Sequence, residues 1–280
     1  MTAPVLAVTG ATGRLGGAVA RRLADAGVAQ RLVVRDPDRA PVLPGAEVVV
    51  ASYADGGAVR RALRGVDVVL LVSAAEAPDR IEQHRCFVDA AVDAGVQQVV
   101  YTSFFGASAD ATFTHGRVHW ATEQHLRASP LRWTFLRDNL YADFLPDLVG
   151  EDGVIRGPAG TGRLAAVVRD DVADVAVAVL GDPDRHAGRT YDLTGPEDLS
   201  LADVAATLTT VTGQEVVYQE ETVEQAYASR AAYGAPAWLL EAWVSTYTAI
   251  ASGELAGPST AVADLTAHPA TSFEQYLRTR

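Results

Sequence analysis

The first half of the chain alternates short apolar runs with longer segments in which apolar residues recur every three or four positions. Short apolar runs are typical of buried strands, and the longer periodic segments are typical of amphipathic helices. The pattern predicts strands at residues 5–9, 31–35, 47–50, 67–72, 97–102 and 132–136. It predicts helices at residues 14–26, 58–63, 79–94 and 116–128. Because strands that alternate with helices form parallel sheets with right-handed crossovers, we expect an α/β fold with a doubly wound parallel sheet.

After Tyr141 this alternation becomes less regular. The pattern then predicts a loop or short strand at 153–158, strands at 190–193 and 215–219, and helices at 169–180, 200–211, 235–251 and 273–278. Gly95 and Ser200 are the expected helix caps, since glycine favours the end of a helix and serine its beginning. The sequence has no long linker and no repeat, so we expect the second half to form a smaller C-terminal lobe.

Composition narrows the classes of partner and compartment. The 280 residues carry a formal net charge of −12, which disfavours nucleic acid as a partner. A single cysteine, Cys86, excludes an intramolecular disulfide and is consistent with a reducing cytoplasm. Residues 1–4 lack a basic segment, and no apolar run is long enough to span a bilayer. We therefore expect a cytoplasmic protein without a signal peptide, bound to no membrane; a homodimer stays open.

Three glycines follow the first predicted strand and open the first predicted helix. The first, Gly10, permits a tight turn, Gly13 lets a backbone approach a pyrophosphate, and Gly16 allows close packing of helix against strand. The order of strand, loop, helix and second strand supports a dinucleotide site over a plain glycine turn. The pyrophosphate would rest on free N–H groups at the start of the helix. The expected contacts are Gly10, Thr12, Gly13, Arg14, Leu15 and Gly16.

The tip of the second predicted strand discriminates between the two nicotinamide cofactors. Arg35 stands there, 19 positions after Gly16, and an arginine at this place accommodates the 2′-phosphate of NADP. Asp36 follows it, and a carboxylate would instead hold the ribose hydroxyl of NAD. We expect Asp36 to begin the next turn. The sequence therefore predicts a preference for NADP(H), with NAD(H) as the alternative, and a Rossmann-type domain.

Several segments resemble the short-chain dehydrogenase/reductase superfamily, in its atypical, NmrA-like branch. The resemblance covers nearly the whole chain and is strongest to members that are NAD(P)H:quinone oxidoreductases of type 2 or azoreductases. It rests on residues 9–16, 34–37, 101–103, 119–137 and 191–197. It implies NADPH binding, with quinone reduction in some members and cofactor sensing in others. We expect residues 1–150 to form the NAD(P)-binding domain and residues 151–280 a substrate lobe that partly completes the sheet.

One departure from the superfamily affects the chemistry. Standard members carry a Tyr-x-x-x-Lys pair, in which the tyrosine is the acid and the lysine lowers its pKa. All 23 basic residues counted as lysine or arginine here are arginine, and His115 and His119 occupy the positions of the pair. Arginine stays charged and does not replace lysine as a proton carrier. A ketone needs an acid as its alkoxide forms, whereas a quinone can accept hydride and later take a proton from water.

The candidate site residues follow from strand ends and aromatic positions. The carboxyl edge of a doubly wound sheet binds ligands, so further cofactor contacts are expected from Val72, Ser73, Ala74, Thr102 and His119. The candidate catalytic residues are Ser103, His119 and Tyr141. An aromatic wall for a planar substrate is expected from Phe104, Phe105, Tyr141 and Phe144, although some of these rings belong to a core. Trp243 and Tyr247, four positions apart, are expected on one helix face.

Each candidate also has a simpler structural interpretation. Ser103 caps a loop in that interpretation, and His119 makes an ion pair with Glu123, one helical turn away. His115, His119 and Glu123 have metal-ligand spacing, but we expect no metal because no further ligands are evident. Two functions stay open at this point. The first is NADPH-dependent reduction of a quinone or related small conjugated carbonyl, and the second is a non-catalytic NADP(H)-binding redox sensor.

Overall fold

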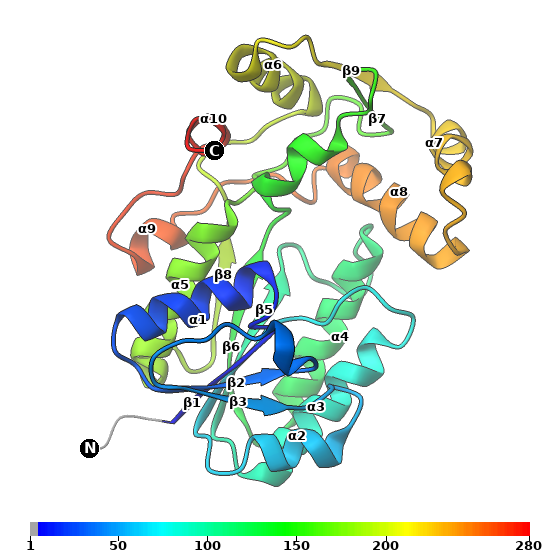
Figure 1. Cartoon of the computed structure of the whole chain (residues 1–280). Helices are drawn as coiled ribbons and strands as arrows, with labels where there is room; N and C mark the ends of the chain where they lie inside the picture. The colour runs from blue at the N-terminus through cyan, green and yellow to red at the C-terminus, as the bar shows by residue number, and fades with distance from the viewer. Residues whose placement is uncertain (1–4) are drawn as a thin grey trace. The chain divides into compact units, whose positions relative to one another are not determined.

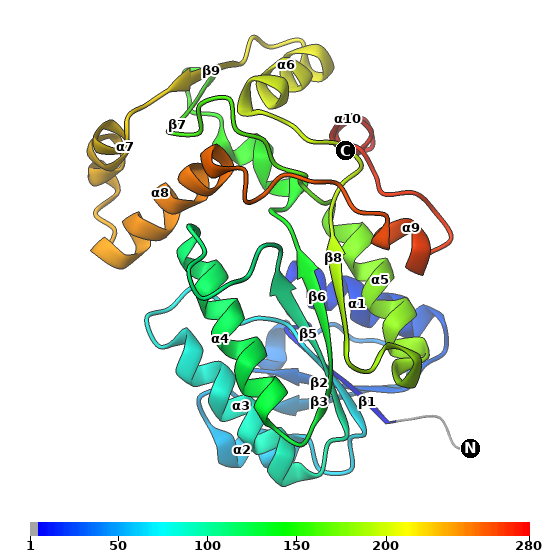
Figure 2. The same ribbon diagram turned by 180° about the vertical axis from the view of Figure 1, so that it is seen from behind.

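A computed structural model describes residues 5–280 of the chain (Figure 1 and Figure 2). Residues 1–4, on which the expectation of no signal peptide depends, lie outside this range. The chain forms two compact units. Unit 1 contains the chain up to Ser103, Trp120–Arg137 and Val172–Tyr191, and unit 2 contains Phe104–His119, Asp138–Asp171 and Asp192–Arg280. The assignment of cofactor and substrate roles to residues 1–150 and 151–280 stays a prediction.

A parallel sheet forms the centre of unit 1. Within residues 5–280 it has seven strands in the order β3-β2-β1-β4-β5-β6-β8. Its strands are β1 (Leu6–Thr9), β2 (Gln30–Val34), β3 (Ala46–Val50), β4 (Val68–Leu71), β5 (Gln98–Phe104), β6 (Arg132–Asp138) and β8 (Arg189–Leu193). β1 pairs in parallel with β2 on one side and β4 on the other, so the strand order reverses at β1. This topology confirms the predicted doubly wound Rossmann-type fold.

Helices cover both faces of this sheet (Figure 1 and Figure 2). On one face lie α1 (Arg14–Asp25) and α5 (Arg169–Gly181), joined by an ion pair of 2.7 Å between Arg22 Nε and Asp174 Oδ1. The other face is covered by α2 (Gly56–Ala62), α3 (Arg80–Ala94) and α4 (Thr114–Ala128). Phe87 of α3 packs there in one buried cluster with Tyr101 and Phe135 of the strands. Burial on both faces is what the uninterrupted apolar strands require.

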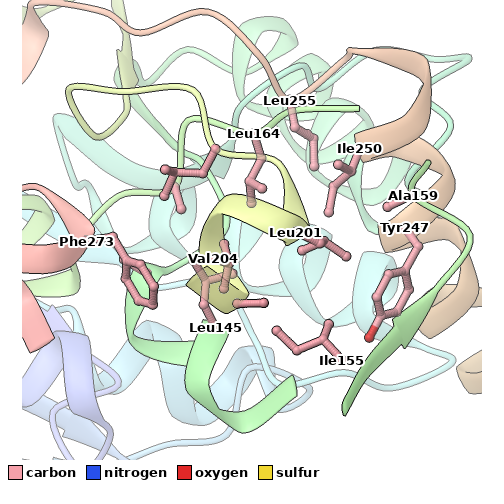
Figure 3. Close-up of a cluster of buried hydrophobic side chains, with 14 of the residues drawn as sticks. Leu145, Ile155, Ala159, Leu164, Leu201, Val204, Tyr247, Ile250, Leu255 and Phe273 are labelled. Carbon is pink, nitrogen blue, oxygen red and sulfur yellow. The ribbon is translucent and has the colours of Figure 1, made fainter. Parts of the chain in front are cut away.

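Unit 2 is assembled from short elements around its own core. Its two-stranded parallel sheet pairs β7 (Val154–Gly157) with β9 (Val217–Glu220). Its α-helices are α6 (Leu201–Thr212), α7 (Val223–Arg230), α8 (Ala237–Ser252), α9 (Ala261–Leu265) and α10 (Phe273–Arg278). Four 3-10 helices among residues 5–280 complete the chain: η1 (Pro37–Arg39), η2 (Ala142–Leu148), η3 (Pro183–His186) and η4 (Ala231–Tyr233). Figure 3 shows Leu201, Tyr247 and Ile250 of the core of unit 2.

Both predicted helix caps are confirmed. Gly95 ends α3 in the left-handed conformation at φ 82°, which glycine adopts without steric cost. Ser200 begins α6 and accepts a hydrogen bond from Asp203 N–H, while the Asp203 side chain accepts from Ser200 N–H. This reciprocal capping box satisfies two backbone donors at the helix start.

Two helices of unit 2 were not predicted. α7 buries Ala226 alone among its eight residues, so it lacks the apolar stripe from which a helix is recognised. A capping box between Thr222 and Gln225 begins it instead. α9 has five residues, too few for a periodic pattern. Throughout residues 5–280, each helix is too short or too polar to cross a membrane.

Candidate functional site

A pocket in unit 1 opens at the carboxyl ends of β1, β2 and β4. Its cavity has a volume of about 220 Å³. Six of the predicted cofactor contacts line it: Gly10, Thr12, Arg35, Val72, Ser73 and Ala74. Gly13, Arg14, Leu15, Gly16 and Thr102 belong to the elements around it without lining the cavity. The strand order reverses at β1, which is where open α/β sheets bind ligands.

The glycine loop has the geometry that its sequence predicts. Gly10 has a positive φ of 65°, and Gly13 N–H donates to Gly10 O across 2.8 Å, so the chain turns tightly after β1. A Cβ on Gly16 would lie 2.5 Å from Gly10 O and 2.6 Å from Thr9 O. Real Cβ atoms do not approach carbonyl oxygens so closely, so α1 packs against β1 only because residue 16 is glycine.

The start of α1 is suited to an anion. Gly13 is the N-cap residue of this described helix start, and it has no side chain that could accept a hydrogen bond from the first-turn amides. The first turn contains no acidic residue, and the exposed Arg14 is the first residue of the helix. N–H groups that no side chain caps, together with the positive end of the helix dipole, attract phosphate. The residues at this end of unit 1 therefore fit the pyrophosphate of a dinucleotide.

Arg35 and Asp36 have separate surroundings. Arg35 follows β2 directly, is exposed and lines the pocket of unit 1. The Asp36 side chain accepts a hydrogen bond of 3.1 Å from Asp38 N–H and caps η1, as the sequence analysis expects. One carboxylate oxygen of Asp36 is thus used within its own turn, whereas Arg35 lines the cavity.

Side chains hold the backbone of the loop that follows β4. Val72 N–H donates to Thr9 Oγ1 across 2.9 Å, and Val72 O accepts from Tyr53 OH across 2.8 Å. Ser73 N–H donates to Thr102 Oγ1 across 2.8 Å. Thr102 therefore orients Ser73, which lines the pocket. Burial raises the pKa of Tyr53, so its hydroxyl stays protonated and can donate to Val72 O.

Ala74 is held from both sides. Its N–H donates to His84 Nε2 across 2.8 Å, and its carbonyl accepts from Arg80 Nε across 2.8 Å. His84 Nδ1 lies 2.9 Å from Thr122 Oγ1. Burial, and then the positive charge of Arg80, lowers the pKa of His84 to about 3. The imidazole is therefore neutral at ordinary pH, with Nε2 free to accept because Nδ1 carries the proton.

Tyr53, Arg80 and His84 were not predicted from the sequence. Arg80 and His84 stand four positions apart on the same face of α3 as Phe87, Val88 and Ala91, and all five are buried. Polar residues within a predicted apolar stripe were the signal that could have found them. Tyr53 gave no such signal, because it lies in an irregular segment between β3 and α2.

Ser103 belongs to a buried cluster with Glu123 and Arg137. Ser103 Oγ donates to Glu123 Oε1 across 2.6 Å. The same carboxylate accepts two hydrogen bonds from Arg137, at 2.8 and 2.7 Å. The Glu123 side chain has no exposed surface, and the Arg137 guanidinium compensates for the loss of water around its carboxylate. The Ser103 hydroxyl thus donates a hydrogen bond to a carboxylate. The two interpretations from the sequence, a substrate contact and a loop cap, did not include this arrangement.

The two histidines at the positions of the Tyr-Lys pair both lie on α4. His115 and His119 are buried, with 8 % and 5 % of their surface exposed. The His119 ring lies 6.0 Å from the Phe104 ring, and Phe104 packs 4.8 Å from Phe113. Phe104 is thus a core residue of unit 2, and Phe105 is partly buried against the same cluster.

Tyr141 is held in a polar environment within unit 2. Its hydroxyl donates to the carboxylate of the buried Asp138, and the Arg169 guanidinium lies 4.6 Å from the ring centre. Burial, followed by the Asp138 charge and hydrogen bond, raises the pKa of Tyr141 well above its ordinary value. The phenol therefore stays protonated and acts as a hydrogen-bond donor.

A second, apolar pocket lies within unit 2, with a cavity of about 370 Å³. Phe144 of η2 lines it, as does the face of α8 that carries Trp243 and Tyr247. The prediction that these two α8 side chains share one face is confirmed. The complete lining is Leu140, Phe144, Leu145, Asp147, Leu148, Arg230, Tyr233, Trp243, Thr246, Tyr247 and Ile250.

Comparison with known proteins agrees with the geometry of unit 1. A family model described as NAD(P)H-binding matches residues 10–183. Quinone oxidoreductase 2 of Escherichia coli is 33 % identical, covering 97 % of this chain and 96 % of its own length. The NAD(P)H azoreductase of Xenophilus azovorans is 30 % identical, covering 98 % and 97 %. The crystal structure of the NADPH-dependent quinone oxidoreductase of E. coli complexed with NADPH superposes with a TM-score of 0.90 at 32 % identity, over 98 % of this chain and 99 % of that one.

These comparisons confirm the resemblance that the sequence suggested. The family match includes the glycine loop, the tip of β2 and the loop after β4, which are the segments that meet at the pocket of unit 1. The chain therefore belongs to the NAD(P)H-binding family.

Proposed function

We propose that this protein is an oxidoreductase that transfers hydride from NADPH to a quinone or a related small conjugated carbonyl. The observation that carries the proposal is the pocket of unit 1, in which the glycine loop, Arg35 and the loop after β4 meet. Relatives that match over nearly their full length are named as a quinone oxidoreductase and an azoreductase, and both names describe reduction of a conjugated acceptor.

The residues of unit 1 have separate tasks in binding the cofactor. The uncapped amides at the start of α1 bind the pyrophosphate, and Arg35 pairs with the 2′-phosphate. Ser73 and Ala74 border the cofactor with a backbone held in place by Thr102, His84 and Arg80. Bound NADPH supplies the hydride. A charged arginine at the 2′ position favours NADPH over NADH because charge-assisted hydrogen bonds to phosphate are strong.

A quinone acceptor accounts for the absence of a Tyr-x-x-x-Lys pair. Hydride adds to the quinone, and the resulting anion takes a proton from water to give the hydroquinone, so no lysine is needed. Burial, followed by the Asp138 charge and hydrogen bond, raises the pKa of Tyr141, so its hydroxyl keeps its proton and donates to Asp138. We assign His119 and Tyr141 of unit 2 to polar contacts with the acceptor, and Phe144, whose ring is 45 % exposed, to an apolar contact with its ring. Ser103 donates its proton to Glu123 and Phe104 belongs to the core of unit 2, so neither is assigned to the acceptor.

The test is NADPH oxidation, followed at 340 nm, with a panel of benzoquinones and naphthoquinones. We expect turnover with at least one quinone and faster turnover with NADPH than with NADH. His119→Ala and Tyr141→Phe should each lower kcat/KM about tenfold or more, as expected for loss of a polar contact to the reacting group. Unchanged kinetics in either variant removes that residue from the mechanism.

One observation favours a second function. The Ser103 proton is already donated to Glu123, and the chain has no lysine, so a protein that binds NADP(H) without catalysis would need nothing more. Stoichiometric NADPH binding without turnover of any acceptor would support this sensor function and overturn the reductase.

A further inference from the structure

The apolar pocket of unit 2 has features of a small-molecule site, and none of the proposed cofactor contacts of unit 1 lines it. Its volume of about 370 Å³ lies in the range of pockets that hold small organic ligands. Three segments far apart in the sequence form it: η2, the end of α7 with η4, and α8. A cavity built from distant segments is specified by the fold rather than by one local turn.

Four of the eleven residues that line this pocket are aromatic: Phe144, Tyr233, Trp243 and Tyr247. Phe144 is 45 % exposed and Tyr233 is 74 % exposed, so both rings are accessible to a ligand. The Tyr233 ring stands perpendicular to Trp243, with ring centres 6.0 Å apart. These rings present faces and edges against which a flat ring can stack, and binding would remove their exposed surface from water.

Tyr247 is held in place by a close approach to β7. A Cβ on Gly157 would lie 2.1 Å from Tyr247 Cδ1, so the ring packs directly on the strand backbone. Figure 3 shows this ring beside Ile155 in the core of unit 2. The guanidinium of Arg230 lies 4.8 Å from the centre of the same ring. Gly157, the core of unit 2 and Arg230 thus fix the Tyr247 ring, so this part of the wall is rigid.

The pocket carries no uncompensated positive charge. Arg230 Nη1 pairs with Glu221 Oε2 at 3.0 Å, and the two side chains are 12 % and 9 % exposed. Arg230 Nη2 also donates to Arg156 O across 2.9 Å. Asp147 also lines the pocket and is exposed. A negatively charged ligand would gain little from a neutralised guanidinium and would be repelled by Asp147.

We infer that the pocket of unit 2 binds planar, uncharged aromatic molecules of the quinone class. The aromatic side chains favour a planar ligand, because flat rings can stack on them. The ion pair of Arg230 with Glu221 favours an uncharged ligand, because it leaves no free positive charge to attract an anion. This inference rests on the proposed function only for the choice of quinones, because the walls would hold any neutral fused ring of similar size.

The test measures binding without cofactor. The probe is 2,3-dimethyl-1,4-naphthoquinone, whose methyl groups block addition of the Cys86 thiol, and its dissociation constant is measured by calorimetry. We expect saturable binding that Phe144→Ala and Tyr233→Ala each weaken about five- to tenfold. Tyr227→Ala, which removes a ring 38 % exposed on α7 outside the pocket, is the matched control and should change affinity less than twofold.

Two further measurements examine the rigid wall and the charge preference. Gly157→Ala displaces the Tyr247 ring and should weaken binding at least tenfold, whereas Gly181→Ala, where a Cβ meets nothing within 4 Å, should not. A sulfonate on the unsubstituted ring of the probe should weaken binding about tenfold. Tighter binding of the sulfonate would overturn the preference for neutral ligands.

The outcomes separate this inference from the proposed function. Quinone binding that responds to Phe144→Ala, without NADPH-dependent turnover, keeps the pocket and removes the reductase. Turnover with an unchanged KM in Phe144→Ala, Tyr233→Ala and Gly157→Ala overturns the pocket and keeps the reductase. Sedimentation showing that Phe144→Ala dissociates a dimer, with no quinone binding, would identify the rings as a subunit contact and also overturn the inference.

Discussion

His84 Nε2 accepts a hydrogen bond from Ala74 N–H across 2.8 Å, so a neutral imidazole fixes the backbone of a residue that lines the pocket of unit 1. The acceptor exists only while the ring is unprotonated. Burial, together with the nearby Arg80 charge, lowers the pKa of His84 to about 3 and secures this state. The relationship has consequences for stability and for cofactor binding.

The first prediction concerns stability and pH. The pKa of His84 is about 3 in the folded protein, against about 6.5 when unfolded, so below pH 6.5 the unfolded chain binds the proton. The free energy of unfolding contributed by His84 is complete above pH 6.5 and is lost as the pH falls toward 3. Between pH 7.5 and 5, the wild type should lose about 2 kcal/mol more than His84→Gln. Urea denaturation at both pH values measures the difference, and identical pH dependence would contradict it.

The second prediction concerns cofactor affinity. His84→Leu removes the acceptor of Ala74 N–H, and a buried amide without its partner costs about 1–3 kcal/mol. We expect the dissociation constant of NADPH to rise about fivefold, while His84→Gln, which retains an acceptor, restores most of the affinity. His125→Leu on α4 is the control, because His125 pairs with the exposed Asp89 at 2.7 Å, outside the pocket. Equal weakening by Leu and Gln would show that only the volume of residue 84 matters.

The third prediction concerns the choice of cofactor. Arg35→Ala should raise the dissociation constant of NADPH about 10- to 100-fold and that of NADH less than threefold, because only NADPH carries the 2′-phosphate. Arg39→Ala removes an exposed arginine of η1 outside the pocket lining and serves as the control. Calorimetry with both nucleotides measures the ratio. An equal effect on NADH and NADPH would exclude Arg35 from phosphate recognition.

The fourth prediction concerns the contact of α1 with β1. In Gly16→Ala the new Cβ would stand 2.5 Å from Gly10 O, so α1 must move away from the strand. We expect a loss of about 3 kcal/mol in the free energy of unfolding and a marked loss of NADPH binding, since the same helix start holds the pyrophosphate. Gly181→Ala, with open space around its Cβ, should leave both quantities within error. Thermal denaturation with and without NADPH measures them, and wild-type stability of Gly16→Ala would refute the close contact.

The fifth prediction concerns the buried Glu123 carboxylate. Glu123→Gln leaves the Arg137 guanidinium without its carboxylate, and breaking a buried pair in this way costs about 3–5 kcal/mol. The exposed Glu82 on α3 provides the control Glu82→Gln, which should change stability by less than about 0.5 kcal/mol. Chemical denaturation compares the two. A Glu123→Gln variant as stable as the wild type would mean that Arg137 pairs with another group.

Several features of the molecule could be predicted from neighbouring residues. The strands and helices of unit 1 follow from apolar periodicity, and the ends of α3 and α6 follow from Gly95 and Ser200. α7 was missed because it is held by its cap and buries Ala226 alone within its length. Periodicity detects a helix only where one face packs against a core.

In the candidate site, too, some residues could be predicted from the sequence and others could not. The sequence predicts Gly10, Thr12, Arg35 and the residues after β4, because parallel strands end at one edge of the sheet. The hydrogen bonds of that loop involve residues 6 to 63 positions apart along the chain, as in Arg80 with Ala74 and Thr9 with Val72. Nothing in the local pattern indicates which distant side chain will accept a given backbone amide.

The amino-acid sequence by itself determined the glycine turn, the order of strands and helices, and the absence of a lysine acid–base pair. Each depends on residue identity or on backbone preferences of adjacent residues. Tertiary structure alone decided that Glu123 bonds Ser103 and Arg137, that His84 stays neutral, and that Phe144 and Trp243 share one cavity. Those properties depend on burial and on distances between remote residues, which exist only after the chain has folded.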